Sequence, residues 1–189
     1  MELIQHREAL LTQVRSQMHE KRYRHTLGVA EVAKELAVRF GADPIKAELA
    51  GLLHDYCKCW EISRLRDYLL RYDFPQDLLS GDKELWHAFV GAIVVHQELK
   101  IQDVEILQAI RYHTTGRENM SLLEKVVCLA DYIEPNRNYP GLEEIRRLAK
   151  QDLNQALALA LGGTICFLIE KKQRVYPLTL LAYNDLVKE

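Results

Sequence analysis

Apolar residues recur every three or four positions along nearly the whole chain, and this spacing limits the fold more than any other feature. Val29, Ala33, Leu36 and Phe40, for example, fall on one stripe of the segment 23–40. An amphipathic helix buries such a stripe, whereas a strand would alternate apolar and polar residues. Proline and glycine, which most disfavour a helix interior, supply only 5 and 9 of the 189 residues. The pattern therefore predicts an all-α protein.

Residues typical of helix starts and helix ends divide this pattern into about nine or ten helices. Asp43 and Pro44 are typical of a helix start, and Gly41 is typical of a helix end. A chain of 189 residues corresponds to about one domain, and no linker or internal repeat divides it. We therefore expect a single domain over residues 1–189. The expected helices cover residues 3–18, 23–40, 44–56, 61–72, 83–98, 102–113, 121–134, 142–149, 152–172 and 179–188.

Composition argues against several classes of protein. The 25 basic and 27 acidic residues give a net charge of −2, without the basic surplus of a nucleic-acid-binding domain. Residues 1–8 lack the apolar core of a signal peptide. The longest uncharged run, residues 153–169, is shorter than the roughly 20 residues that cross a bilayer, so we expect a buried helix there, which is also the candidate surface of a homodimer. The four cysteines form no C-x-x-C pair, as expected for free thiols in a cytoplasmic protein.

Several catalytic motifs are missing from the sequence. It contains no G-x-G-x-x-G, no G-x-x-x-x-G-K-[ST], no G-x-S-x-G and no H-E-x-x-H segment. These absences argue against dinucleotide oxidoreductases, P-loop phosphotransferases, lipase-like hydrolases and zincin metalloproteases.

His54 and Asp55 end an apolar segment and form the first candidate site. Ala50 and Gly51 lie one turn earlier, where small side chains let a second helix approach closely. Imidazole and carboxylate groups are ligands that suit a divalent metal such as iron or manganese. The alternative is a core histidine with satisfied hydrogen bonds beside an aspartate at a helix end.

His25 and Asp131 each lie on the apolar stripe of a predicted helix. His25 shares its face with Val29, and Asp131 shares its face with Val127. A buried imidazole or carboxylate needs a partner, and a metal ion is one such partner for each of them. The alternatives are a structural histidine and a salt bridge from Asp131 to an arginine.

Two more histidines are candidates for the same site. His87 shares a helix face with Gly91, where a ligand can come close, whereas His96 lies about 180° away and is expected to be structural. His113 ends a predicted helix and is followed by Thr114-Thr115-Gly116, whose hydroxyl and amide donors suit a phosphate. We expect His87 and His113 to face one centre, to contact phosphate and to stabilise charge on a leaving group, with His113 as a candidate proton donor.

The order of these residues, His25, His54-Asp55, His87, His113 and Asp131, resembles the HD-domain superfamily of metal-dependent phosphohydrolases, with Lys58 completing an H-D-x-x-K motif. A closer resemblance, over nearly the whole chain, is to the YqeK-type family of symmetrical dinucleoside tetraphosphatases of bacteria. The segments that carry it are Arg22-x-x-His25-Thr26, His54-Asp55-Tyr56-x-Lys58, His87-x-x-x-Gly91-Ala92, His113-Thr114-Thr115-Gly116, Leu129-Ala130-Asp131-Tyr132-Ile133-Glu134-Pro135-x-Arg137 and Arg174-x-Tyr176-Pro177.

This resemblance implies a compact all-helical HD fold and cleavage of diadenosine tetraphosphate into two ADP. It implies iron as the metal, with manganese, cobalt or zinc as alternatives, and His25, His54, Asp55 and Asp131 as its ligands. It implies His87, His113, Asp55 and Lys58 as catalytic residues. The residues that it implies in nucleotide binding are Arg22, His25, Asp55, His87, His113, Thr114, Asp131, Arg137, Arg174, Val175, Tyr176, Pro177, Leu178 and Thr179.

Three other interpretations stay open at this point. The chain is an HD phosphohydrolase of nucleoside mono- or triphosphates, or a nucleotide-binding sensor that holds a metal but turns over slowly, or a helical interaction module whose histidines are structural. Analysis of the reaction products separates the two enzymes. The presence of a complete ligand set argues against the sensor.

Overall fold

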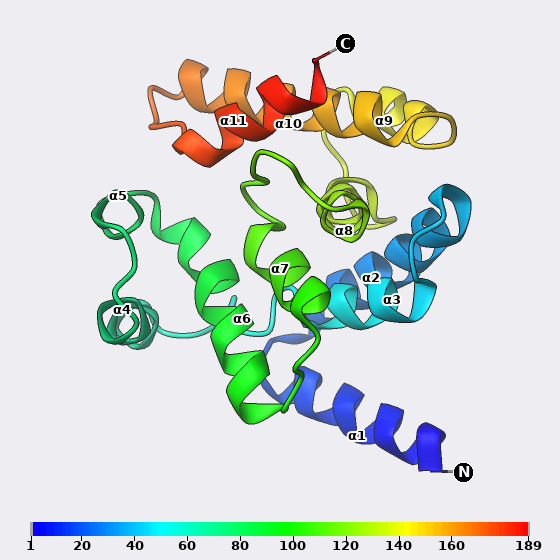
Figure 1. The fold of residues 1–189 in the computed structure, drawn as a ribbon, viewed down its shortest axis with the longest axis vertical. Coiled ribbons are helices and arrows are strands. Elements are labelled where there is room, and N and C mark those ends of the chain that lie inside the picture. Colours follow the sequence, from blue (N-terminus) through cyan, green and yellow to red (C-terminus); the bar gives the residue numbers. More distant parts are fainter. Residues whose placement is uncertain (1, 189) are drawn as a thin grey trace.

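The computed structural model describes the backbone of residues 2–188 and the side chains of residues 7–188. In chain order the elements are α1 (Glu2–Ser16), α2 (Glu20–Phe40), α3 (Pro44–Leu53), α4 (Ile62–Arg71), α5 (Gln76–Leu79), the 3-10 turn η1 (Lys83–Leu85), α6 (Trp86–Glu98), α7 (Val104–Tyr112), α8 (Leu122–Ile133), α9 (Leu142–Leu148), α10 (Leu153–Glu170) and α11 (Pro177–Leu186) (Figure 1). These residues form no strand, which confirms the predicted all-α class.

Helices α2, α3, α6, α7 and α8 pack against one another and form the core of the molecule (Figure 1). Helix α6 is apolar nearly all round and is buried along most of its length, so it lies inside. On α3, a Cβ added to Gly51 would lie 2.7 Å from Cα of Ala30 on α2. The sequence predicts a close helix approach at the small residues here, and the structure shows that the position of Gly51 requires a glycine.

The structure differs from the predicted helices at the start of α2 and in one additional short helix. Helix α2 begins at Glu20 rather than at residue 23, because the His19 ring accepts a hydrogen bond from the backbone amide of Arg22 at 3.2 Å and caps the helix. His25 therefore lies in the second turn of α2 and not at its start. The four-residue α5 is missing from the predicted helices, because a single turn contains no apolar period that a sequence pattern can reveal.

Helix α3 ends at Leu53, three residues earlier than predicted. Three successive turns, each closed by a hydrogen bond to the residue three positions earlier, then carry the chain from Leu53 to Trp60. His54 and Asp55 consequently lie just beyond the helix, where the helical repeat no longer fixes the direction of their side chains. This places both at the centre of the core.

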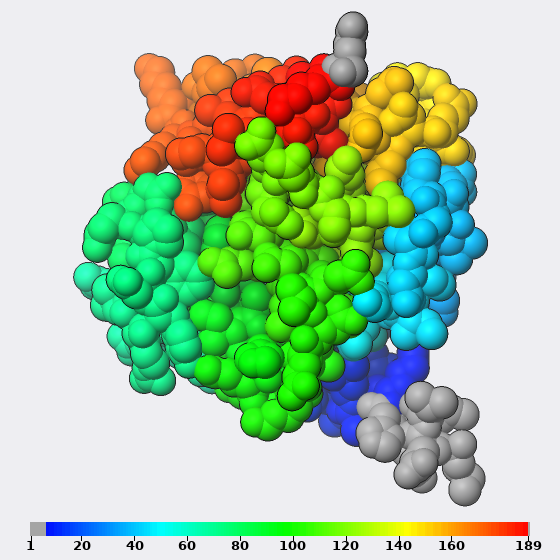
Figure 2. Space-filling model, viewed as in Figure 1, coloured from blue at the N-terminus to red at the C-terminus, as the bar shows by residue number. Residues whose placement is uncertain are grey.

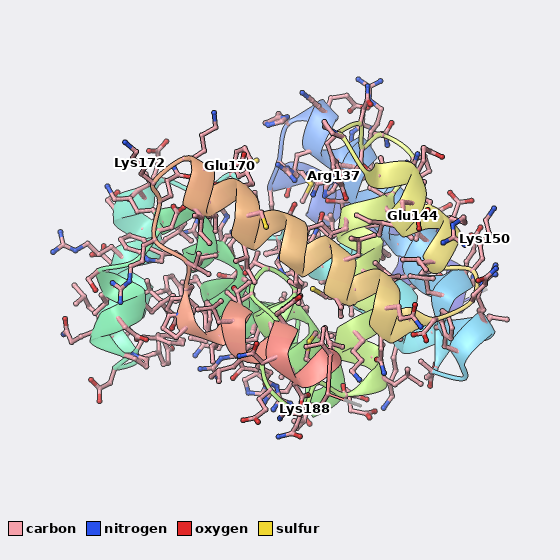
Figure 3. All side chains as sticks on the ribbon, turned by 90° about the horizontal axis from the view of Figure 1, so that it is seen from above. Arg137, Glu144, Lys150, Glu170, Lys172 and Lys188 are labelled. Carbon is pink, nitrogen blue, oxygen red and sulfur yellow. The ribbon has the colours of Figure 1, made fainter. Side chains whose placement is uncertain are left out.

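The prediction of a buried helix at residues 153–169 is wrong for one face of α10. Leu159 is 42% exposed and Phe167 is 54% exposed. Length and a mean hydropathy of 1.5 would let α10 cross a membrane, and only 33% of it is buried in the protein. Its other face packs against α8, α9 and α11, so it is the outer helix of a C-terminal layer. Figure 3 looks onto this layer and shows the labelled charged residues around its edge.

The C-terminal layer, formed by α9, α10 and α11, covers one end of the core (Figure 1, Figure 2). In the space-filling view the orange segment that joins α10 to α11 meets the green segment near α5 (Figure 2). There Arg174 Nη1 lies 3.5 Å from Ser80 Oγ, although the two residues are 94 positions apart. This meeting forms one wall of the pocket described below.

Candidate active site

Six polar side chains from the five core helices meet at one place. They are His25 from α2, His54 and Asp55 from the end of α3, His87 from α6, His113 from the end of α7, and Asp131 from α8. All are buried except Asp131, whose side chain is 19% exposed. Polar groups in an apolar core need partners, so the geometry of these groups decides what they can bind.

Asp131 and one oxygen of Asp55 face the first two histidines. His25 Nε2 lies 3.0 Å from Asp131 Oδ1 and 3.6 Å from Asp55 Oδ2. His54 Nε2 lies 3.2 Å from Asp55 Oδ2 and 3.9 Å from Asp131 Oδ1. Two nitrogens and two carboxylate oxygens thus converge on one small space. We call these four residues the first cluster.

The other oxygen of Asp55 faces the remaining two histidines. His87 Nε2 lies 3.0 Å from Asp55 Oδ1, and His113 Nε2 lies 3.8 Å from the same atom. The two Nε2 atoms are 3.2 Å apart. We call His87, His113 and this oxygen the second cluster. Asp55 therefore belongs to both clusters and divides its two oxygens between them.

Each of the four rings is held through its other nitrogen, Nδ1. The carbonyl oxygen three residues earlier accepts a hydrogen bond from His54, His87 and His113 at 2.6, 2.7 and 2.7 Å. His25 instead donates to Glu134 Oε1 at 3.0 Å. Because these partners are acceptors only, this network assigns a proton to Nδ1 of each ring. The four Nε2 atoms point into the two clusters, where each can hold a proton or, in the neutral ring, offer a lone pair to a metal ion.

The first cluster fits a metal ion. Lone pairs and carboxylate oxygens that face one another repel, and a cation between them removes the repulsion. His25 Nε2 and His54 Nε2 are buried and have no hydrogen-bond partner among the residues that the structure describes. Neutral imidazole and carboxylate ligands suit iron, manganese, cobalt and zinc.

Burial and neighbouring charges set the protonation of the site. Burial raises the pKa of Asp55, but in the metal-free protein the adjacent imidazoles donate protons to its oxygens, and this holds that pKa well below its ordinary value. Despite burial, a hydrogen bond from the His25 ring and the charge of Arg137 lower the pKa of Asp131. Burial lowers the pKa of His113 to about 3. At neutral pH the carboxylates are therefore ionised and His113 is neutral.

Two arginines flank the first cluster. Arg22 Nη1 lies 2.8 Å from Asp55 Oδ2. Arg137 donates from Nε to the carbonyl oxygen of Asp131 at 2.8 Å and from Nη2 to its carboxylate. The salt bridge that the sequence left as an alternative for Asp131 is thus present beside the cluster. Both arginines were predicted to contact nucleotide, and each now holds an aspartate of the cluster in place.

A pocket lies beside the second cluster. It is lined by Gly81, Asp82, Leu85, Thr114, Thr164, Leu168, Arg174, Tyr176 and Thr179. Thr114 directly follows His113, which links the pocket to the cluster. Four of these residues were predicted from the sequence to contact nucleotide, namely Thr114, Arg174, Tyr176 and Thr179. Val175, Pro177 and Leu178, predicted with them, are not part of this lining.

Sequence reasoning missed the rest of the lining. Asp82 and Leu85 come from η1 and its flank, and Thr164 and Leu168 come from α10. No local motif marks these residues, because they reach the pocket only when the C-terminal layer closes over the core.

Two further predicted residues lie outside both clusters. Lys58 Nζ pairs with Glu84 Oε2 at 2.8 Å, and the backbone carbonyl of Glu84 is the acceptor that holds His87. His96 is exposed, and its Nδ1 lies 2.9 Å from the carbonyl oxygen of Ile101. His96 thus lies apart from the clusters, as expected from its helix face.

Comparison with known proteins identifies close relatives. A family model described as "HD domain" matches residues 22–136. A "Bis(5'-nucleosyl)-tetraphosphatase, symmetrical" from Bacillus subtilis (strain 168) is 52% identical over 181 residues, which cover 96% of this chain and 97% of the relative. A relative with the same description from Halalkalibacterium halodurans is 51% identical over 93% of this chain and 94% of its own length. A crystal structure described as a predicted HD superfamily hydrolase involved in NAD metabolism, from Clostridium acetobutylicum, is 36% identical, covers 95% of this chain and 96% of that one, and has a TM-score of 0.91.

Proposed function

The chain belongs to the HD domain family and, within it, to the symmetrical bis(5'-nucleosyl)-tetraphosphatases, and we propose that it hydrolyses diadenosine tetraphosphate at its centre into two ADP. The observation that carries this proposal is the meeting of six polar side chains from five helices beside a pocket. The clusters suit the reacting phosphates. The pocket has a volume of only about 50 Å³, so we propose that its polar residues Thr114 and Arg174 contact the phosphates of one nucleotide and do not enclose the nucleoside.

We propose the first cluster as the ligand set of a metal ion, with iron as the metal. His25 and His54 would supply nitrogen ligands, and Asp55 and Asp131 would supply oxygen ligands. When bound, such an ion polarises a phosphoryl oxygen and lowers the pKa of water. The donor set also accepts manganese, cobalt and zinc, so elemental analysis of the purified protein identifies the metal.

The second cluster and the two arginines would act on the polyphosphate itself. His87 and His113 face the Asp55 oxygen that the first cluster leaves free, and we propose that they contact the bridging phosphates and stabilise charge on the leaving ADP. Arg22 and Arg137 carry forked donors that match phosphate oxygens, and both reach the first cluster. Thr114 would position the phosphates next to the pocket.

Lys58 has a different place in this proposal. Its ammonium pairs with Glu84 instead of a cluster member. The carbonyl of Glu84 accepts the Nδ1 hydrogen bond of His87. We therefore propose that Lys58 steadies the turn that orients His87, in place of the direct catalytic role predicted from the sequence.

The proposed domain extends over residues 1–189, beyond the matched residues 22–136. Helix α10 and the segment before α11 supply Thr164, Arg174 and Tyr176 to the pocket, which supports this extent. The four cysteines are free, which supports the expected cytoplasmic location. The homodimer through α10 stays a prediction, supported by its exposed apolar face and tested by the mass of the protein in solution.

Product analysis tests the proposed activity. Diadenosine tetraphosphate is expected to give ADP as the sole nucleotide product, because attack at the central linkage leaves two phosphates on each side. Chromatography of a complete digest measures this directly. AMP, ATP, inorganic phosphate or triphosphate as a main product would instead support an HD phosphohydrolase with another bond preference, and binding without turnover would support the sensor.

Two arginines proposed to bind nucleotide, Arg174 in the pocket and Arg137 beside the first cluster, are expected to contribute to the affinity for ADP. Arg174→Ala and Arg137→Ala are each expected to weaken ADP binding by roughly 1.5–3 kcal/mol, the contribution of a hydrogen bond to a charged group. Calorimetric titration with ADP measures this, and metal content should stay at the wild-type level in Arg174→Ala. Lys171→Ala is the matched control, because it removes an exposed cation at the end of α10. Unchanged affinity in both arginine variants would mean that these residues do not contact the nucleotide.

A further inference from the structure

One buried acid contacts the first cluster without belonging to it. Glu134 follows the last residue of α8 and is 1% exposed. Its Oε1 accepts the hydrogen bond from Nδ1 of His25 at 3.0 Å. Its Oε2 accepts hydrogen bonds from the backbone amide of Asn136 at 2.7 Å and from Asn136 Nδ2 at 2.9 Å. Both carboxylate oxygens are thus engaged, and the acid is held in one orientation behind the His25 ring.

The Nδ1 proton of His25 needs a side-chain acceptor because His25 lies inside its helix. His54 and His113 follow the last residues of α3 and α7, where backbone carbonyls have no helical partner and are free to accept from the ring. His25 lies inside α2, where the preceding carbonyls accept the hydrogen bonds of the helix. The proton on its Nδ1 therefore needs an acceptor from another element, and Glu134 supplies it.

Helix α2 leaves room for this acid at one position. Gly28 lies one turn after His25, and a Cβ at Gly28 would lie 2.7 Å from Glu134 Oε2 and 3.4 Å from Pro135 Cδ. Glycine disfavours a helix interior, so the contact with Glu134 gives its presence in α2 a packing reason. A substitution at Gly28 and a substitution at Glu134 therefore disturb the same contact from two different segments.

We propose that Glu134 is a positioning residue, which keeps the proton of His25 on Nδ1 and aims the Nε2 lone pair at Asp55 and Asp131. The consequence for metal binding rests on the proposed function, whereas the tautomer does not. A carboxylate behind a metal-binding imidazole fixes the ring and raises its basicity, and loss of such a partner typically lowers metal affinity by about 10- to 100-fold.

The tautomer is measured on the metal-free protein by nitrogen-15 NMR of the imidazole rings. Wild type is expected to carry a proton on His25 Nδ1, hydrogen-bonded to Glu134. In Glu134→Ala this Nδ1 proton is expected to be lost and the ring to keep a proton on Nε2 alone, because Nε2 lies 3.0 Å from Asp131 Oδ1 and Nδ1 has lost its acceptor. Glu134→Gln has a single acceptor oxygen, which the two donors of Asn136 favour on their side. Its amide nitrogen then faces His25, so this variant should also lose the Nδ1 proton. A proton that stays on Nδ1 in Glu134→Ala would overturn the proposal.

Metal affinity is measured separately, by titration with Mn²⁺ or Co²⁺ against a chelator. Glu134→Ala and Glu134→Gln are each expected to bind about 10- to 100-fold more weakly, because neither offers His25 Nδ1 an acceptor. Gly28→Ala should weaken binding in the same direction, because its Cβ displaces Glu134 Oε2. The amide variant keeps the proposal testable if the alanine variant does not fold.

Glu124→Gln is the matched control. Glu124 is also 1% exposed and lies on α8, but it pairs with Arg117 at 2.7 and 2.8 Å, away from the histidines. This variant is expected to lower the unfolding temperature and leave metal affinity unchanged. Wild-type protein that binds no metal would overturn the proposed function but not the tautomer result. A metal affinity that equals that of wild type in Glu134→Ala, Glu134→Gln and Gly28→Ala would overturn the proposed role of Glu134.

Discussion

Asp131→Ala is expected to remove the bound metal and to lower kcat/KM by roughly 10³-fold or more. A metal ion at a phosphoryl centre contributes several kcal/mol of charge stabilisation, and each 1.4 kcal/mol corresponds to about a factor of ten in rate. The variant loses one of the two oxygen ligands that face His25 and His54. Elemental analysis and steady-state hydrolysis of diadenosine tetraphosphate, on the same preparation, measure both effects.

This substitution also removes the carboxylate partner of Arg137, so circular dichroism and the unfolding temperature first establish that the variant is folded. Asp103→Ala is the contrasting control. Asp103 caps α7 by accepting from the amides of Glu105 and Ile106, at 2.9 and 3.3 Å. Its loss should cost about 0.5–2 kcal/mol of stability while metal and activity remain. An Asp131→Ala protein with full metal occupancy and activity would show that the proposed ligand set is wrong.

His87→Ala and His113→Ala are each expected to lower kcat by roughly 10²- to 10⁴-fold, the range for a positioned acid or charge donor. Both rings lie in the second cluster, next to Asp55 Oδ1, and His113 directly precedes the pocket residue Thr114. Neither is needed to complete the first cluster, so metal content should stay near that of wild type. Kinetics and metal analysis on matched preparations decide this, with His96→Ala as the exposed histidine control.

Loss of metal from either histidine variant would indicate a second metal site. The two Nε2 atoms of the second cluster and one oxygen of Asp55 lie within 3.8 Å of one another, a spacing that also suits a metal ion. If either histidine variant loses one of two metal equivalents, the single-metal assignment has to be replaced by a site in which Asp55 bridges two ions. If metal content is unchanged and kcat is also unchanged, neither histidine acts on the phosphates.

The helical class and the residues of the first cluster could be predicted because they depend on local properties. The 3.6-residue spacing predicts each long helix, and a polar side chain on an apolar stripe, such as His25 or Asp131, stands out in the sequence itself. Short or irregular segments could not be predicted in this way. The four residues of α5 and the early end of α3 at Leu53 depend on turns that have no apolar period.

Contacts between residues far apart in the chain could likewise not be predicted from the sequence. Residues 134 and 25 are 109 positions apart, and nothing near either residue indicates that they share a proton. Leu168 and Asp82 line one pocket only because the C-terminal layer folds back over the core. The exposed face of α10 follows from the same cause, since an apolar run does not say how many neighbours will cover it.

The sequence by itself determined which segments are helical and which residue types are available for a metal and for phosphates. Periodicity and side-chain chemistry are properties of neighbours in the chain, so the sequence displays them directly. The tertiary structure alone decided how these groups are used. The packing of five helices splits the two oxygens of Asp55 between the clusters, turns four Nε2 atoms inward and seats Glu134 behind His25. Such choices depend on distances between separate helices, which only the packed core sets.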